Sequence, residues 1–172
     1  MLKFFQFSGT ISGTTYFLRM LFTILLSIPG IILIFSFFGS YLMNEGFIDM
    51  NNPESFDQLA FQEQIEANPE EFFSNLWSSF SFGWIISLAI AFLPAIWFSL
   101  ASYYKRISAL FYENRNNIFA IIIGFEIIGD LTGLGILDSI SFLKTPFSII
   151  SLLIFLFLIF KNSDIDKDDH EG

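Results

Sequence analysis

Two acidic residues, Glu126 and Asp130, interrupt an otherwise apolar stretch in the second half of the chain. Because they are four positions apart, a helix would place both side chains on one face. Counted from Ile118, they lie near the middle of a membrane-spanning helix. Carboxylates at that depth usually face a bundle interior or a water-filled cavity, and two neighbouring ones favour sharing a proton. The pair is therefore a candidate ion or proton site.

The sequence also supports a structural interpretation of these acids, and favours it. Weak helix formers cluster around Asp130, namely Gly129, Thr132, Gly133 and Gly135. They predict a short or re-entrant span that would leave Asp130 in water at the outer interface. Pairing with Arg19 or Lys144 is a further alternative, in which the carboxylates would be packing elements.

Three basic residues, Arg19, Lys105 and Arg106, are candidate contacts for anionic lipid head groups. Basic side chains at a cytoplasmic membrane surface gain about 1 kcal/mol each near negative lipid. The sequence favours a plainer role as determinants of topology, and the two roles are compatible.

The rest of the chain offers little chemistry. It has no cysteine, and its single histidine, His170, is expected to stand alone in a mobile tail. The tail has the Asp-x-Asp-x-Asp spacing that opens a calcium loop, but Asp169 replaces the glycine at position six and the chain ends before the final glutamate. With no triad-like pattern and no phosphate loop, we expect no enzyme activity, catalytic residue, cofactor or metal site.

Composition places the chain in a membrane. Of its 172 residues, 53% are hydrophobic and 15% charged, and the mean hydropathy is +0.62. The net charge of −9 comes mostly from segments 45–71 and 164–171, which disfavours nucleic-acid binding. The apolar residues form long blocks, which predict an all-α integral membrane protein, a bundle of about four transmembrane helices in one domain, 1–163. The predicted spans are about 18–43, 76–104, 118–137 and 140–160.

An external acidic loop, 44–75, separates the first two predicted spans, and residues 164–172 are predicted to be a disordered acidic cytoplasmic tail. Asn52-Pro53 and Asn68-Pro69 each combine a capping asparagine with a proline at the first helical position. They predict a short helix over 53–67 and a second that continues without a break into the second span. The short helix is either an amphipathic insertion that packs on the bundle or on a partner, or a solvated connector.

Lysine and arginine set the predicted orientation. They lie near the N-terminus, between the second and third spans and after the fourth span, whereas the loop between the first two spans has none. Positively charged loops face the cytoplasm, so both termini are predicted to be cytoplasmic and the acidic loop external.

The N-terminal segment Phe7-Ser8-Gly9-Thr10-Ile11-Ser12-Gly13, followed by Tyr16-Phe17, resembles the opening of small bacterial inner-membrane proteins classed as domain of unknown function family 805. Pro94 and Lys105-Arg106-Ile107 resemble that family's second signature. The chain departs from it at Thr10 and Gly13, where arginines are usual, and at Ser108-Ala109, which replaces a His-Asp pair.

The resemblance implies a multi-pass protein of the bacterial cytoplasmic (inner) membrane and brings no established reaction. Our leading hypothesis from the sequence is a non-enzymatic scaffold or partner-interacting protein in the lipid bilayer, as a homo-oligomer or with a membrane-protein partner. The alternative is a small oligomeric channel or transporter that uses Glu126 and Asp130 for a proton or cation.

Overall fold

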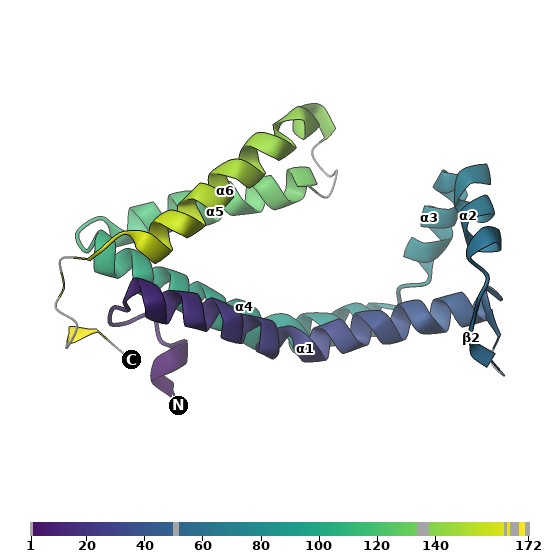
Figure 1. The fold of residues 1–172 in the computed structure, drawn as a ribbon, viewed down its shortest axis with the longest axis horizontal. Helices are drawn as coiled ribbons and strands as arrows, with labels where there is room; N and C mark the ends of the chain where they lie inside the picture. The colour runs from purple at the N-terminus through teal and green to yellow at the C-terminus, as the bar shows by residue number, and fades with distance from the viewer. Residues whose placement is uncertain (1, 50–51, 134–137, 164, 166–168, 171–172) are drawn as a thin grey trace. The chain divides into compact units, whose positions relative to one another are not determined.

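A computed structural model describes residues 2–49, 52–133, 138–163, 165 and 169–170 (Figure 1). The described residues are mostly helical, which confirms the predicted all-α membrane class. The α-helices are α1 (Gly13–Asn44), α2 (Gln58–Ala67), α3 (Pro69–Ser78), α4 (Phe82–Leu110), α5 (Arg115–Gly133) and α6 (Lys144–Phe160). Two 3-10 helices, η1 (Leu2–Phe5) and η2 (Asp138–Leu143), and two short antiparallel strands, β1 (Ile48–Asp49) and β2 (Asn52–Phe56), complete the order.

Among the described residues, three helices are long and apolar enough to cross a membrane: α1, α4 and α5. The ends of these helices differ from the ends of the predicted spans by up to six residues. The fourth predicted span corresponds to α6, which has 17 residues. At 1.5 Å per residue it is about 25 Å long, slightly less than the roughly 30 Å hydrocarbon thickness. The count of four spans therefore stays a prediction.

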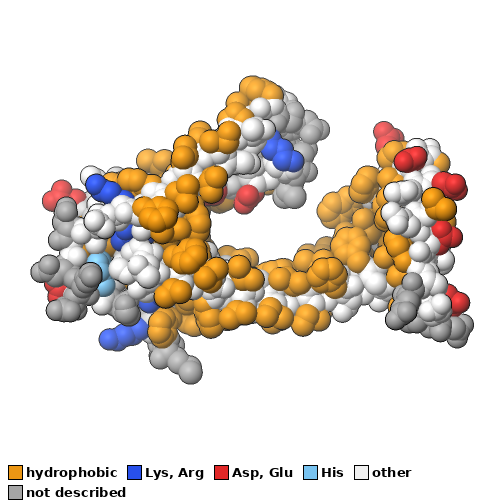
Figure 2. All heavy atoms as spheres, in the orientation of Figure 1, with side chains coloured by type: hydrophobic (Ala, Val, Ile, Leu, Met, Phe, Trp, Pro, Cys, Tyr) orange, Lys and Arg blue, Asp and Glu red, His pale blue; other side chains and the backbone are white. Residues whose placement is uncertain are grey.

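The chain divides into two compact units, and α1 and α4 contribute to both. Unit one comprises residues 1–24 and 95–172, and unit two comprises residues 25–94. Over both units the helices present hydrophobic side chains on most of their visible surface, while acidic side chains gather over α2 and α3 (Figure 2). Apolar helix surfaces of this kind suit contact with lipid.

Unit one is held together where the start of α1, the end of α4 and the end of α6 meet (Figure 1). Its buried core consists of Ile11, Tyr16, Ile107 and Leu158. The last turns of α4, from Lys105 to Ala109, are buried throughout, including their polar members.

In unit two the predicted helix start at Pro53 is wrong. Residues Asn52–Phe56 form β2, which pairs with β1, and α2 begins only after Asp57. The Asp57 carboxylate accepts a hydrogen bond from the backbone N–H of Ala60 at 3.0 Å, so this acid supplies the cap that Asn52 was expected to provide. The second predicted start is confirmed, because Asn68 caps α3 and Pro69 occupies its first turn.

The predicted continuous helix from Pro69 into the second span is also wrong. α3 ends at Ser78 and α4 begins at Phe82. Serine hydroxyls explain the break, because Ser81 Oγ accepts the backbone N–H of Trp84 at 3.1 Å and so caps a new helix. Phe80, between α3 and α4, stacks on Phe37 of α1 with ring centroids 4.4 Å apart. This contact holds the connection between the two helices against α1 within unit two.

Candidate functional site

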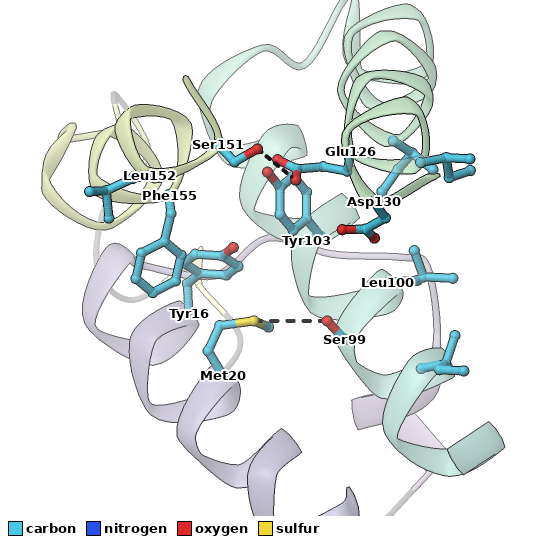
Figure 3. Close-up of a pocket in the computed structure, with 13 residues that line it drawn as sticks. Tyr16, Met20, Ser99, Leu100, Tyr103, Glu126, Asp130, Ser151, Leu152 and Phe155 are labelled. Atoms are coloured by element: carbon cyan, nitrogen blue, oxygen red, sulfur yellow. Dashed lines mark hydrogen bonds between the residues drawn. The ribbon is translucent and has the colours of Figure 1, made fainter. Parts of the chain in front are cut away.

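A cavity of about 700 Å³ lies within unit one, among α1, α4, α5 and α6 (Figure 3). Most of its lining is apolar. The polar lining consists of Tyr16, Ser99, Tyr103, Glu126, Asp130 and Ser151. The four helices thus bring the two predicted carboxylates together with hydroxyl groups that the sequence analysis did not single out.

Glu126 points into this cavity from α5 and is held by α6. Its Oε2 atom accepts a hydrogen bond from Ser151 Oγ at 2.9 Å (Figure 3). Asp130 lines the same cavity one turn further along α5. The helix is continuous to Gly133, and Gly129 packs closely on Phe147, where an added Cβ would lie 3.4 Å from the Phe147 Cβ. α5 begins at Arg115, before the first residue of the predicted third span, 118–137. Residues 134–137 of that span lie outside the described residues.

Among the described residues, Glu126 accepts its hydrogen bond from a neutral side chain, Ser151. Pairing of either acid with Arg19 or Lys144 stays a prediction. Lys144 shares only a second cavity with them, of about 600 Å³, between α5 and α6.

The Tyr16 hydroxyl is the most unusual polar group at the site. Tyr16 is 0% exposed and lines the cavity, and its hydroxyl has no hydrogen-bond partner among the described residues. Its ring meets that of Tyr103 edge-on, with centroids 5.8 Å apart. The hydroxyl end of the side chain lies toward the cavity (Figure 3). A buried hydroxyl without a partner costs about 1–3 kcal/mol, so this one is poised to bind something that enters the cavity.

The three basic residues predicted to contact lipid head groups are all covered by the chain itself. Arg106, 1% exposed, donates from Nε to the Leu158 carbonyl at 2.6 Å, from Nη1 to the Ile11 carbonyl at 3.2 Å, and from Nη2 to the Lys161 carbonyl. Its guanidinium thus ties together the chain segments that begin α1 and end α6.

Lys105 and Arg19 have similar internal positions. Lys105 Nζ donates to the Lys3 carbonyl at 2.6 Å, and the Arg19 guanidinium lies over the Phe4 ring, 5.0 Å from its centroid. Both residues therefore anchor η1. Contact of the three side chains with lipid head groups stays a prediction.

Residues of the N-terminal motif have identifiable structural roles. Gly9 adopts a φ of 81°, which favours glycine, and Ile11 is fully buried. Ser12 Oγ accepts the backbone N–H of Thr15 at 3.1 Å and so caps α1. Phe7 packs edge-on against Trp97 at 5.3 Å. The motif folds the N-terminal segment against α4.

The expectation that His170 stands alone is wrong. Its Nε2 lies 2.9 Å from Ser163 Oγ and its Nδ1 lies 3.2 Å from Thr10 Oγ1. Partial burial lowers the pKa of His170, the positive charge of Arg106 lowers it further, and Asp169 opposes both. The other acids of the predicted disordered tail lie outside the described residues, so its disorder is untested.

The residues that the sequence analysis missed are Tyr16 as a site residue, Tyr103 and Ser151. Tyr16 belongs to the N-terminal motif, and Ser151 is a polar residue in the most apolar helix, α6, so each carried a signal in the sequence. Their convergence on Glu126 depends on how four helices pack, which periodicity does not give.

Comparison with known proteins adds no assignment. No protein-family model, no curated protein and no solved structure matches this chain.

Proposed function

We propose that this chain is a multi-pass protein of a bacterial cytoplasmic membrane that binds a proton or cation at Glu126 and Asp130 and exchanges it across the membrane. One observation carries the proposal. Glu126, Asp130 and Ser151 line both the 700 Å³ cavity and the 600 Å³ cavity, so the two cavities adjoin the same stretch of α5. A ligand moving between the two cavities would pass the carboxylates.

The energetics of buried charge support this proposal. A carboxylate inside a bilayer is unfavourable unless it is protonated or paired with a cation. Among the described residues, the hydrogen-bond partner of Glu126 is the neutral Ser151, and the lining of the 700 Å³ cavity includes no lysine or arginine. A bound proton or cation would neutralise the carboxylate, and its release would leave the carboxylate charged and able to bind the next one. A site that exchanges ions has to alternate between these two states.

The depth of the two acids along α5 gives the proposed path a direction. At 1.5 Å per residue, Glu126 lies about 10 Å along the helix axis from Gly133, and Asp130 about 5 Å. The second cavity extends from these acids to Lys144, the first residue of α6. Under the predicted topology this end is external, so Asp130 would receive the cation first and Glu126 would hold it deeper.

A second function, the scaffold or partner interaction that the sequence favoured, has its own observation in unit two. The acidic α2 and α3 expose large apolar side chains, of which Leu59 and Trp77 are more than two-thirds exposed. A neighbouring membrane protein, or another copy of the chain in an oligomer, would cover them. The two functions are compatible because they use different units.

Proton flux in reconstituted liposomes tests the leading proposal. The purified chain is placed in liposomes that contain a pH-sensitive dye, and flux is recorded after a pH step with and without an imposed membrane potential. We expect flux above that of protein-free liposomes, and a loss of about tenfold or more in Glu126→Gln, which keeps the shape of the side chain and removes its charge.

The matched control is Glu113→Gln, which changes an exposed glutamate between α4 and α5. It should keep the flux of the unaltered chain. Asp130→Asn should reduce flux less than Glu126→Gln if Asp130 is the outer of the two groups. Equal flux in all four proteins would exclude the carboxylates as the site of exchange.

A further inference from the structure

The 700 Å³ cavity is much larger than a proton or a bare metal ion requires. We propose that its ligand is an amphiphilic organic cation, an ammonium group attached to an apolar body. The inference rests on the proposed function, because the ammonium would bind the same carboxylates. It adds the chemical class of the ligand.

The volume and the lining both point to an organic molecule. Cavities of about 300–1,000 Å³ that are mostly apolar, with a few placed polar groups, are typical of sites for small organic ligands. Here the apolar wall includes Ile96, Leu100, Leu152 and Phe155, from α4 and α6. An inorganic ion with its water shell would leave this wall in contact with water, whereas an alkyl or aryl group would cover it.

The polar groups of the cavity suit an ammonium head. An ammonium has three N–H donors and no acceptor, and the cavity offers the carboxylates of Glu126 and Asp130 as acceptors. The buried Tyr16 hydroxyl, which has no partner among the described residues, can accept a further hydrogen bond. The ring of Tyr103 adds a face for cation–π attraction.

Charge selects against other ligands of the same size. No lysine or arginine is among the described residues that line this cavity, so an anionic amphiphile would meet two carboxylates without a counter-charge. A neutral amphiphile would fill the apolar part but leave the acids unpaired. The cation alone satisfies both parts of the cavity.

Three probes of similar shape test the charge preference: phenylbutylamine, phenylbutanol and phenylbutyrate. Each is titrated by calorimetry into the chain reconstituted in lipid nanodiscs, with empty nanodiscs subtracted to remove partition into lipid. We expect the amine to bind at least about tenfold more tightly than the alcohol, and the acid to bind most weakly. Glu126→Gln should remove the preference for the amine, while Glu113→Gln should keep it.

A second variant tests the apolar part of the cavity. Ile123→Trp enlarges a side chain of the cavity wall without changing charge. We expect it to weaken amine binding about tenfold. Equal affinities for the amine and the alcohol, or an amine preference that survives Glu126→Gln, would overturn the inference even if flux depends on Glu126. Loss of flux dependence on Glu126 would instead overturn the proposed function.

Discussion

The guanidinium of Arg106 occupies the space beside Gly13. A Cβ atom added to Gly13 would lie 3.3 Å from Nη2 of Arg106, and only 1.9 Å from the carbonyl oxygen of Ile159. The backbone of α6 therefore approaches α1 so closely that only glycine fits.

Gly13→Ala should destabilise unit one. The added methyl group would have to displace backbone, and overpacking of this kind costs typically about 1–3 kcal/mol. The free energy of unfolding can be measured by denaturant titration in mixed micelles. Gly39→Ala, in the same helix, is the control, because nothing lies within 4 Å of a Cβ there and alanine favours helix. Equal stability of Gly13→Ala and Gly39→Ala would show that the close contact is absent in the protein.

Removing the Arg106 side chain should cost more than any exposed substitution. Arg106→Met would leave the carbonyls of Ile11, Leu158 and Lys161 without their donor, at about 1–3 kcal/mol for each buried group that stays unsatisfied. Arg106→Lys should rescue only part of the loss, because one ammonium lacks the spread of the guanidinium fork. Lys161→Met, at an exposed side chain, should change the same free energy of unfolding by no more than about 0.5 kcal/mol. Full rescue by lysine would show that the charge matters and the three bonds do not.

Tyr16→Phe distinguishes a ligand-binding hydroxyl from a structural one. Because the hydroxyl has no partner among the described residues, its removal should leave the thermal stability of the ligand-free protein unchanged or slightly raised. Binding of phenylbutylamine should weaken by roughly threefold to tenfold, the value of one hydrogen bond. A fall in ligand-free stability together with unchanged amine binding would assign the hydroxyl to the protein's own packing.

His170 gives the fold a dependence on pH. Because the pKa of the docked imidazole is below its ordinary value of about 6.5, docking favours the neutral ring. Its stabilising contribution is complete above that ordinary value and is lost as the pH falls through the lower pKa of the docked state. His170 is the only histidine, so its ring resonances in an NMR titration of the histidine-labelled protein are unambiguous.

Thr10→Ala, Ser163→Ala is the matched variant for this titration, since it removes both hydrogen-bond partners of the ring. We expect the His170 pKa to lie below about 6.5 in the unaltered chain and to return toward it in the variant. A pKa at or above the ordinary value in the unaltered chain would mean that the ring is not docked between Thr10 and Ser163.

The sequence predicted the membrane class and the approximate spans because a long apolar block is rarely found in a protein except as a membrane-spanning helix. It was wrong at two places where short-range chemistry decides the structure. Asp57 rather than Asn52 caps α2, and Ser81 starts a new helix inside a run that periodicity treats as continuous. An N-cap residue stabilises a helix by about 1 kcal/mol, so two neighbouring candidate caps differ too little in free energy for a sequence pattern to tell which one is used.

Only part of the candidate site could be predicted in this way. Glu126 and Asp130 were candidates from the sequence because ionisable residues are rare in apolar stretches, and the structure places both at one cavity. Tyr16 and Ser151 were not found as partners, because their approach to Glu126 depends on long-range packing of α1 and α6 with α5. The buried positions of Lys105 and Arg106 were missed for the same reason, since basic residues near a span end are usually exposed.

The protonation state of Glu126 in the bilayer is the most direct test of the central claim. Infrared difference spectroscopy on the chain in lipid nanodiscs detects the carbonyl-stretching band of a protonated carboxylic acid. We expect this band to change when phenylbutylamine is added to the unaltered chain or to Glu113→Gln, and not to change when it is added to Glu126→Gln. A spectrum in which no carboxylic-acid band changes on addition of the amine, or in which the same change persists in Glu126→Gln, would contradict the assignment of Glu126 as the group that exchanges a proton for a cation.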